Sequence, residues 1–361
     1  MLYRLLYPLA ARFPAFNVFR YITFRTAMSA VTALVVALVL GPAMIRLLKR
    51  YQIAQSIRQE GPKSHLAKAG VPTMGGVLIL LAVVTATLLW MDLANRFVWI
   101  ALAALVGLGA VGFADDWVKV TKRRNLGLTG RGKLVPQFVM ALAVGFAIEQ
   151  WAGHGAFSTV VSFPFLKKLL VDLGILYIPF VAVVVVGSSN AVNLTDGLDG
   201  LAIGAVGIAA GTYAVLAYVT GNAVAAKYLQ IPFIPQSGEL AVFCGALVGA
   251  ALGFLWFNCH PAEVIMGDVG ALSLGAAIAA VAVMTKQEML LAIVGGLFVL
   301  EALSVIIQVA SFKSTGRRVF KMAPLHHHFE LMGWAESRVI IRFWILAILF
   351  AVLGLSTLKL R

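Results

Sequence analysis

Long, almost uncharged apolar runs constrain the fold of this chain more than any other feature. A helix needs about 20 apolar residues to cross the hydrocarbon core of a bilayer, and runs of this kind recur throughout the 361 residues. Hydrophobic residues make up 61% of the chain and charged residues only 12%, whereas soluble domains carry roughly 25% charged residues. The sequence therefore predicts an all-α integral membrane protein, and it excludes disordered and collagen-like chains.

Ten apolar runs predict ten transmembrane helices in one polytopic domain that covers residues 1–361. Residues 1–25, rich in Arg and aromatic side chains, are expected to lie in the membrane interface. Little more than the polar trio at 286–288 separates the eighth run from the ninth, so a tight turn with water-contacting side chains is expected there. The predicted spans are 24–48, 74–91, 97–115, 134–151, 175–191, 200–220, 238–257, 269–285, 288–310 and 339–358.

The distribution of Lys and Arg predicts the orientation of the spans. Segments 46–68, 119–133 and 313–342 carry six basic residues each, 18 of the 29 in the chain. Because basic loops favour the cytoplasm, both termini are predicted to be periplasmic, as is a small hairpin at 154–174. Loop 311–338 is then cytoplasmic. In a membrane protein the net charge of +14 indicates topology and anionic substrates, so no nucleic-acid partner is expected.

Acidic and amide side chains gather at the predicted cytoplasmic ends of the spans. Asp115 and Asp116 end the third span, and adjacent helical side chains point about 100° apart, so we expect them to face different groups. Taken alone, the pair could equally lie in the interface without a function. Asp268 begins the eighth span, where a helix cap is the simpler interpretation. Because carboxylates from several loops share one side, they together predict a site for Mg²⁺ and a diphosphate.

Two further motifs add amides, carboxylates and histidines on the same side. Asn193, Asp196 and Asp199 recur every third residue, so they stack along one side if the segment is helical. In Pro324-Leu-His-His-His-Phe-Glu330, three successive histidines point in three directions and make a poor zinc site. One of them is expected to face an anionic substrate. Glu301 lies within a span, where a buried, protonated carboxyl group bonded to a neighbouring helix is the favoured interpretation.

These motifs together resemble the polyprenyl-phosphate N-acetylhexosamine-1-phosphate transferases, over nearly the whole chain. The loop at 68–76 and the triple histidine are most similar to one branch, the phospho-N-acetylmuramoyl-pentapeptide transferases. The resemblance implies ten helices with both termini outside, an active site on the cytoplasmic face of the bacterial cytoplasmic (inner) membrane, and Mg²⁺ as cofactor. The implied substrates are UDP-MurNAc-pentapeptide and undecaprenyl phosphate, which give lipid I and UMP. A homodimer is left open.

The resemblance also implies roles for individual residues. Asp268 corresponds to the Mg²⁺ ligand. Relatives often carry Phe, which can stack on the uracil ring, where this chain has Ile265, so an aliphatic contact to uracil is expected here instead. The catalytic positions are Asp115, Asp116, Asp196 and His326, and the other substrate-binding positions are Lys68, Lys133, Asn193, Asp199 and Asn258.

Several alternatives stay open at this point. One aspartate of the 115–116 pair could deprotonate the acceptor phosphate, or an aspartate could form a covalent phospho-enzyme. A sister transferase that uses UDP-GlcNAc shares the acidic motifs. A transporter or an intramembrane aspartyl protease would place its ionisable residues deep in the membrane, whereas here nearly all of them lie near one face.

Overall fold

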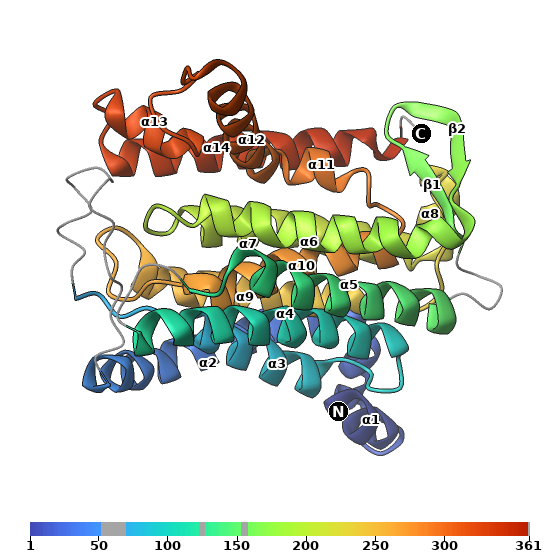
Figure 1. The fold of residues 1–361 in the computed structure, drawn as a ribbon. Helices are drawn as coiled ribbons and strands as arrows, with labels where there is room; N and C mark the ends of the chain where they lie inside the picture. The colour runs from blue at the N-terminus through green and yellow to red at the C-terminus, as the bar shows by residue number, and fades with distance from the viewer. Residues whose placement is uncertain (52–69, 123–126, 153–157, 360–361) are drawn as a thin grey trace.

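Long helices lie side by side as a bundle in the computed structural model, which describes residues 1–51, 70–122, 127–152 and 158–359 (Figure 1). Among these residues, nine helices are long and apolar enough to cross a membrane, which confirms an integral membrane protein that is mainly helical. The nine are α2 (Ile22–Arg50), α4 (Arg96–Thr121), α5 (Gly130–Ala152), α6 (Tyr177–Thr195), α7 (Leu201–Thr220), α9 (Glu239–Asn258), α10 (Gly267–Met284), α12 (Gly296–Thr315) and α14 (Glu336–Ser356).

The second predicted span, 74–91, forms the shorter helix α3 (Gly76–Trp90) of 15 residues. At about 1.5 Å per residue it is roughly 22 Å long, less than the roughly 30 Å hydrocarbon core. It nevertheless packs against α2, α9 and α10 within the bundle. A total of ten spans, with both termini outside, therefore stays a prediction.

Short helices and a β-hairpin lie at the ends of the bundle. The hairpin expected at 154–174 forms from antiparallel strands β1 (Val160–Phe163) and β2 (Leu166–Asp172), while residues 153–157 lie outside the described part. The ninth predicted span, 288–310, is divided at Gly295 into α11 (Leu291–Val294) and α12. The remaining short helices are α1 (Leu2–Leu6), α8 (Ala223–Leu229), α13 (Leu325–Leu331) and 3₁₀ turns at Tyr7–Ala11, Pro14–Arg20, Gly174–Leu176 and Thr357–Lys359.

The turn between α10 and α11 corrects one expectation. Its polar side chains are buried rather than water-contacting, with Lys286 7%, Gln287 1% and Glu288 5% exposed. Lys286 Nζ donates to the Tyr177 hydroxyl and to Glu288 Oε1, both at 2.9 Å, and the Tyr213 hydroxyl donates to the Gln287 carbonyl oxygen. Tyrosines of α6 and α7 thus supply hydrogen-bond partners in place of water for the Lys286 side chain and the Gln287 backbone.

Helix α10 is enclosed by the bundle, and every residue from Asp268 to Met284 is buried. It packs against α3, α4, α6 and α7. At its crossing with α4 the two backbones approach closely, because a Cβ added to Gly112 would lie 2.2 Å from the Asp268 carbonyl oxygen. This contact fixes the beginning of α10 beside the end of α4, where the chain carries its paired aspartates.

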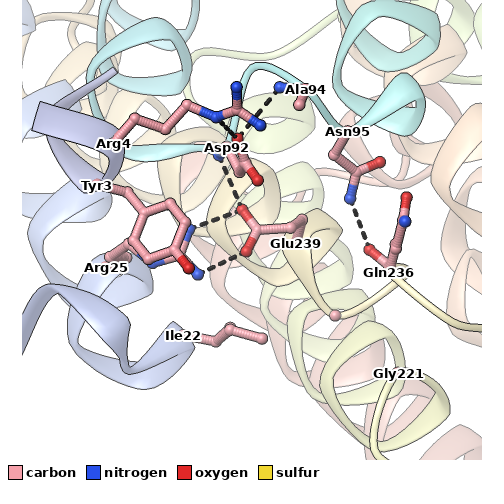
Figure 2. A pocket seen from close by; sticks show the side chains of 11 residues that line it. Tyr3, Arg4, Ile22, Arg25, Asp92, Ala94, Asn95, Gly221, Gln236 and Glu239 are labelled. Carbon is pink, nitrogen blue, oxygen red and sulfur yellow. Dashed lines mark hydrogen bonds and ion pairs between the residues drawn. The ribbon is translucent and has the colours of Figure 1, made fainter. Parts of the chain in front are cut away.

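A buried ion pair joins α2 to α9 near α1, as Figure 2 shows. Arg25 donates to both carboxylate oxygens of Glu239, at 2.7 Å and 2.5 Å, and the two residues are 2% and 9% exposed. The Tyr3 ring covers the guanidinium at 4.6 Å, and the Asp92 amide also donates to Glu239. These residues line a cavity of about 390 Å³. The pair therefore ties together the two helices that share the most extensive packing.

Replacing Glu239 with Gln is expected to lower the free energy of unfolding by about 3–5 kcal/mol, because it leaves the buried Arg25 charge uncompensated. The control is Arg4→Gln, which breaks a pair with Asp92 whose Arg side chain is 57% exposed; exposed pairs contribute about 0–1 kcal/mol. Unfolding in mixed detergent micelles would measure both. Equal losses in the two variants would contradict a structural role for the buried pair.

Candidate active site

Three aspartates from two helices meet at one end of the bundle. Asp115 and Asp116 lie in the last turns of α4 and Asp268 in the first turn of α10, and they are only 2%, 3% and 9% exposed. One carboxylate oxygen from each lies within 4.8 Å of the others. The three aspartates thus form a single cluster, which is how an oxygen-lined metal site is built.

Two lysines partly neutralise this cluster. Lys119 Nζ lies 2.6 Å from Asp115 Oδ2, 3.3 Å from Asp116 Oδ1 and 3.0 Å from Asp268 Oδ2. Lys133 of α5 contacts Asp268 Oδ2 and lies 4.0 Å from Asp115 Oδ2. Sequence reasoning did not select Lys119, although its position four residues after Asp115 places it on the same helix face. Three carboxylates facing two ammonium groups form a compact mixed-charge centre.

The side chains of Asp115 and Asp116 share one partner and differ in another. Asp115 Oδ1 accepts a hydrogen bond from the Leu128 amide at 2.8 Å, whereas Asp116 Oδ2 accepts one from the Val269 amide at 3.2 Å. Their other oxygens both contact Lys119. One oxygen of each carboxylate thus faces a different group, as expected, while the other oxygens share Lys119, which lies three and four residues further along the helix.

Asn193, Asp196 and Asp199 do not lie on one helix, because α6 ends between the first two of them. Asn193 lies on the helix, and its Nδ2 donates to Asp268 Oδ1 at 2.8 Å, so it joins the aspartate cluster. The helix ends at Thr195, with Asp196 as its C-cap, and Asp199 lies in the following loop. The three side chains therefore do not stack along one helix side, because the helix stops before the last two of them.

Asp199 and Asn258 connect two loops beside the cluster. Asp199 Oδ2 accepts from the Ala262 amide at 3.1 Å. Asn258 accepts from the Gly200 amide at 3.0 Å and donates to the Val264 carbonyl at 2.8 Å. Both ends of its amide thus bond to backbone, and Asn258 joins the loops after α6 and α9.

The histidines point in three directions, as expected. His326 is fully buried, with Nδ1 3.3 Å from Glu301 Oε1 of α12. A Cβ added to Gly197 would lie 2.2 Å from His326 Nε2, so the imidazole packs directly on the loop that carries Asp196 and Asp199. His327 pairs with Glu330 at 2.8 Å, and His328 Nδ1 accepts from the Lys321 amide. Glu301 is buried as predicted, and sequence reasoning did not identify His326 as the side chain that it faces.

Ile265 links the site to the segment before α3. Its amide donates to the Pro72 carbonyl at 2.8 Å, and its carbonyl accepts from the Gly75 amide at 2.9 Å. Lys68 lies outside the described residues. The other predicted site residues lie in the aspartate cluster or in the loops beside it, except His326, which lies in α13 and packs on the loop after α6.

The protein is a helical membrane bundle with a buried carboxylate–lysine centre. Comparison with known families gives its class: residues 98–286 match the family described as glycosyl transferase family 4. Residues 68–80 match phospho-N-acetylmuramoyl-pentapeptide-transferase signature 1.

Full-length relatives narrow the class further. Proteins named phospho-N-acetylmuramoyl-pentapeptide-transferase from Koribacter versatilis (strain Ellin345), Geobacter sp. (strain M21) and Desulfatibacillum aliphaticivorans are 56%, 57% and 58% identical to this chain, with 100% of both chains covered. The chain belongs to the phospho-N-acetylmuramoyl-pentapeptide-transferase family.

Proposed function

We propose that this chain transfers phospho-MurNAc-pentapeptide from UDP-MurNAc-pentapeptide to undecaprenyl phosphate, which gives lipid I and UMP. The observation that carries the proposal is the buried cluster of three aspartates with Lys119 and Lys133. Phosphoryl transfer depends mainly on positioning and on neutralising charge on the phosphate oxygens. Lys119 and Lys133 contact the carboxylates in this structure, and both would contact the diphosphate oxygens when the donor binds.

The aspartate cluster also fits Mg²⁺, which prefers carboxylate oxygens and keeps several waters. Asp268 would hold the ion, with Asp115 and Asp116 beside it, since one oxygen of each aspartate lies within 4.8 Å of the others. Bound Mg²⁺ would supply charge neutralisation for the diphosphate. We assign Lys133 and Asn193 to this diphosphate region, because both contact Asp268.

We assign one of two roles to Asp115 or Asp116. One of them deprotonates the lipid phosphate, or one of them attacks the donor and forms a covalent phospho-enzyme. Asp196 and His326 belong to the same catalytic region, because the buried imidazole supports the loop that carries Asp196. The nucleotide would then lie against Lys68, Asp199, Asn258 and Ile265. The contacts of Asp199 and Asn258 with neighbouring backbone support a preformed wall there.

The turnover assay is decisive for this function. Purified protein with a polyprenyl phosphate should release UMP from UDP-MurNAc-pentapeptide, and only when Mg²⁺ is present. Release from UDP-GlcNAc instead would favour the sister transferase. No release from either donor would overturn the proposal.

We further propose that the chain lies in the bacterial cytoplasmic membrane with the aspartate cluster on the cytoplasmic face. Cys259, which is exposed in the loop after α9, should then resist an impermeant thiol reagent in intact spheroplasts. A Ser158→Cys variant in the Cys259→Ser background should be labelled, because exposed Ser158 precedes the hairpin. Cys244 is buried and adds little background. Labelling of Cys259 together with protection at position 158 would reverse the orientation.

A further inference from the structure

The cavity beside the Arg25–Glu239 pair (Figure 2) lies at the membrane–water interface, at the end of the bundle opposite the aspartate cluster. Asn95, the N-cap of α4, lines this cavity, whereas Asp115 lies near the other end of the same helix. At about 1.5 Å per residue, the helix rises by roughly 30 Å between these two residues, which matches the hydrocarbon core of a bilayer at about 30 Å. A ligand of this cavity would therefore come from the interface and not from the transfer site.

The N-terminal segment forms one wall of the cavity and is suited to contact with lipid. Tyr3 and Arg4 of α1 line the cavity, and Leu5, Leu9 and Phe13 further along the segment are 55%, 41% and 59% exposed. Segments with basic, aromatic and exposed apolar side chains lie in the membrane interface, where tyrosine is enriched. The cavity therefore lies beside a segment whose apolar side chains would contact acyl chains.

Two arginines of the cavity can donate further hydrogen bonds. Arg25 donates to Glu239 through Nη1 and Nη2, but its buried Nε has no hydrogen-bond partner among the described residues. A buried N–H group without an acceptor is costly, so Arg25 favours a ligand with an acceptor oxygen. Arg4 donates to Asp92 through Nε at 2.6 Å, and its side chain is 57% exposed. Because a guanidinium has five N–H donors, Arg4 can bind a ligand oxygen while it keeps Asp92.

Asp92 supplies a negative charge to the same cavity. Burial alone would raise the pKa of its carboxyl group, but the hydrogen bonds from Arg4 and from the Ala94 amide outweigh burial and lower the pKa below its usual value. Asp92 is therefore ionised at neutral pH, and its side chain is 24% exposed, so it can accept a hydrogen bond from a ligand. Glu239 adds a second carboxylate to the lining. The cavity thus favours a ligand that carries both an acceptor anion and a donor cation.

We propose that this cavity binds the headgroup of phosphatidylethanolamine, with the phosphate accepting from Arg4 and Arg25 and the primary ammonium donating to Asp92. An anionic headgroup without an amine would offer no cation to Asp92, and the quaternary ammonium of phosphatidylcholine has no N–H to donate. Small-ligand pockets span about 300–1,000 Å³, and the cavity of about 390 Å³ falls in this range. Binding here is independent of the transfer reaction, and in the orientation proposed above the lipid would lie in the periplasmic leaflet.

Native mass spectrometry of the full chain, in detergent micelles that contain one defined lipid, tests this site. Phosphatidylethanolamine should bind the wild type about tenfold more tightly than phosphatidylglycerol or phosphatidylcholine, the scale of one charged hydrogen bond. Arg4→Gln should weaken phosphatidylethanolamine binding about tenfold, because it removes a charged donor to the phosphate. Asp92→Asn should weaken it by a similar factor and leave phosphatidylglycerol binding unchanged, so that the two lipids bind this variant within about threefold of each other.

Arg12→Gln is the matched control, because Arg12 is an exposed arginine of the same N-terminal segment that does not line the cavity, and it should leave all three lipid affinities unchanged. Comparing lipids within one variant removes any effect of basal stability on the result. Equal affinity of the wild type for the three lipids would overturn the site, as would phosphatidylethanolamine binding that Arg4→Gln leaves intact or that Arg12→Gln weakens equally. Tighter binding of phosphatidylglycerol than of phosphatidylethanolamine would show a simple anion site and also overturn it.

Discussion

Replacing Asp268 with Asn is expected to lower kcat by about 10²- to 10³-fold, the scale for removing one group that stabilises charge in a transition state. The amide preserves the shape of the side chain but removes a charge that contacts Lys119 and Lys133 and accepts from Asn193. Loss of the carboxylate should also weaken Mg²⁺ binding. Turnover measured across a Mg²⁺ titration should therefore show a higher requirement in the variant.

Asp172→Asn is the control for loss of one carboxylate elsewhere, because Asp172 is exposed on β2. It should retain wild-type turnover and the wild-type Mg²⁺ requirement. Normal turnover of Asp268→Asn at the wild-type Mg²⁺ optimum would remove Asp268 from the metal ligands.

Asp115→Asn and Asp116→Asn are expected to differ from one another, and at least one should lose about 10²-fold or more in turnover, the usual scale for a general base. The physical reason is their different second partners, the Leu128 amide for Asp115 and the Val269 amide for Asp116. Donor binding is assigned chiefly to the loops after α6 and α9. Each variant should therefore bind UDP-MurNAc-pentapeptide with near-wild-type affinity.

Calorimetry with the nucleotide donor, paired with turnover across pH, measures these two properties separately. A loss of affinity that matches the loss of rate in both variants would place the pair at the donor site. The assignment of either aspartate to the acceptor phosphate would then be wrong.

The sequence predicted the positions of the long helices better than the breaks and short helices between them. Apolar run length is a direct signal for a spanning helix, so nine predicted spans correspond to helices that are long enough. The break at Gly295 and the short helices α8 and α13 carry no such signal. Burial of the turn at Lys286 depends on Tyr177 and Tyr213, which are far away in sequence, and residue patterns do not reveal such partners.

The site was predictable as a set of residues and less so as a set of contacts. Carboxylates at helix ends on one side indicated the cluster, and the structure brings Asp115, Asp116 and Asp268 together. Their lysine partner on α4 was detectable from helical spacing. The contact between Glu301 and His326 depends on tertiary packing, which no local sequence pattern reveals.

The enclosure of α10 has a mechanical consequence for an enzyme that works in lipid. Changes in bilayer thickness act on lipid-facing helices, which tilt or shift to match their surroundings. The helix that carries Asp268 is buried along its length, whereas only 28% of the apolar stretch is buried in each of α2 and α12. Outer helices can therefore adjust to longer or shorter acyl chains while the aspartate cluster keeps its dimensions, which would insulate catalysis from the composition of the membrane that supplies the lipid substrate.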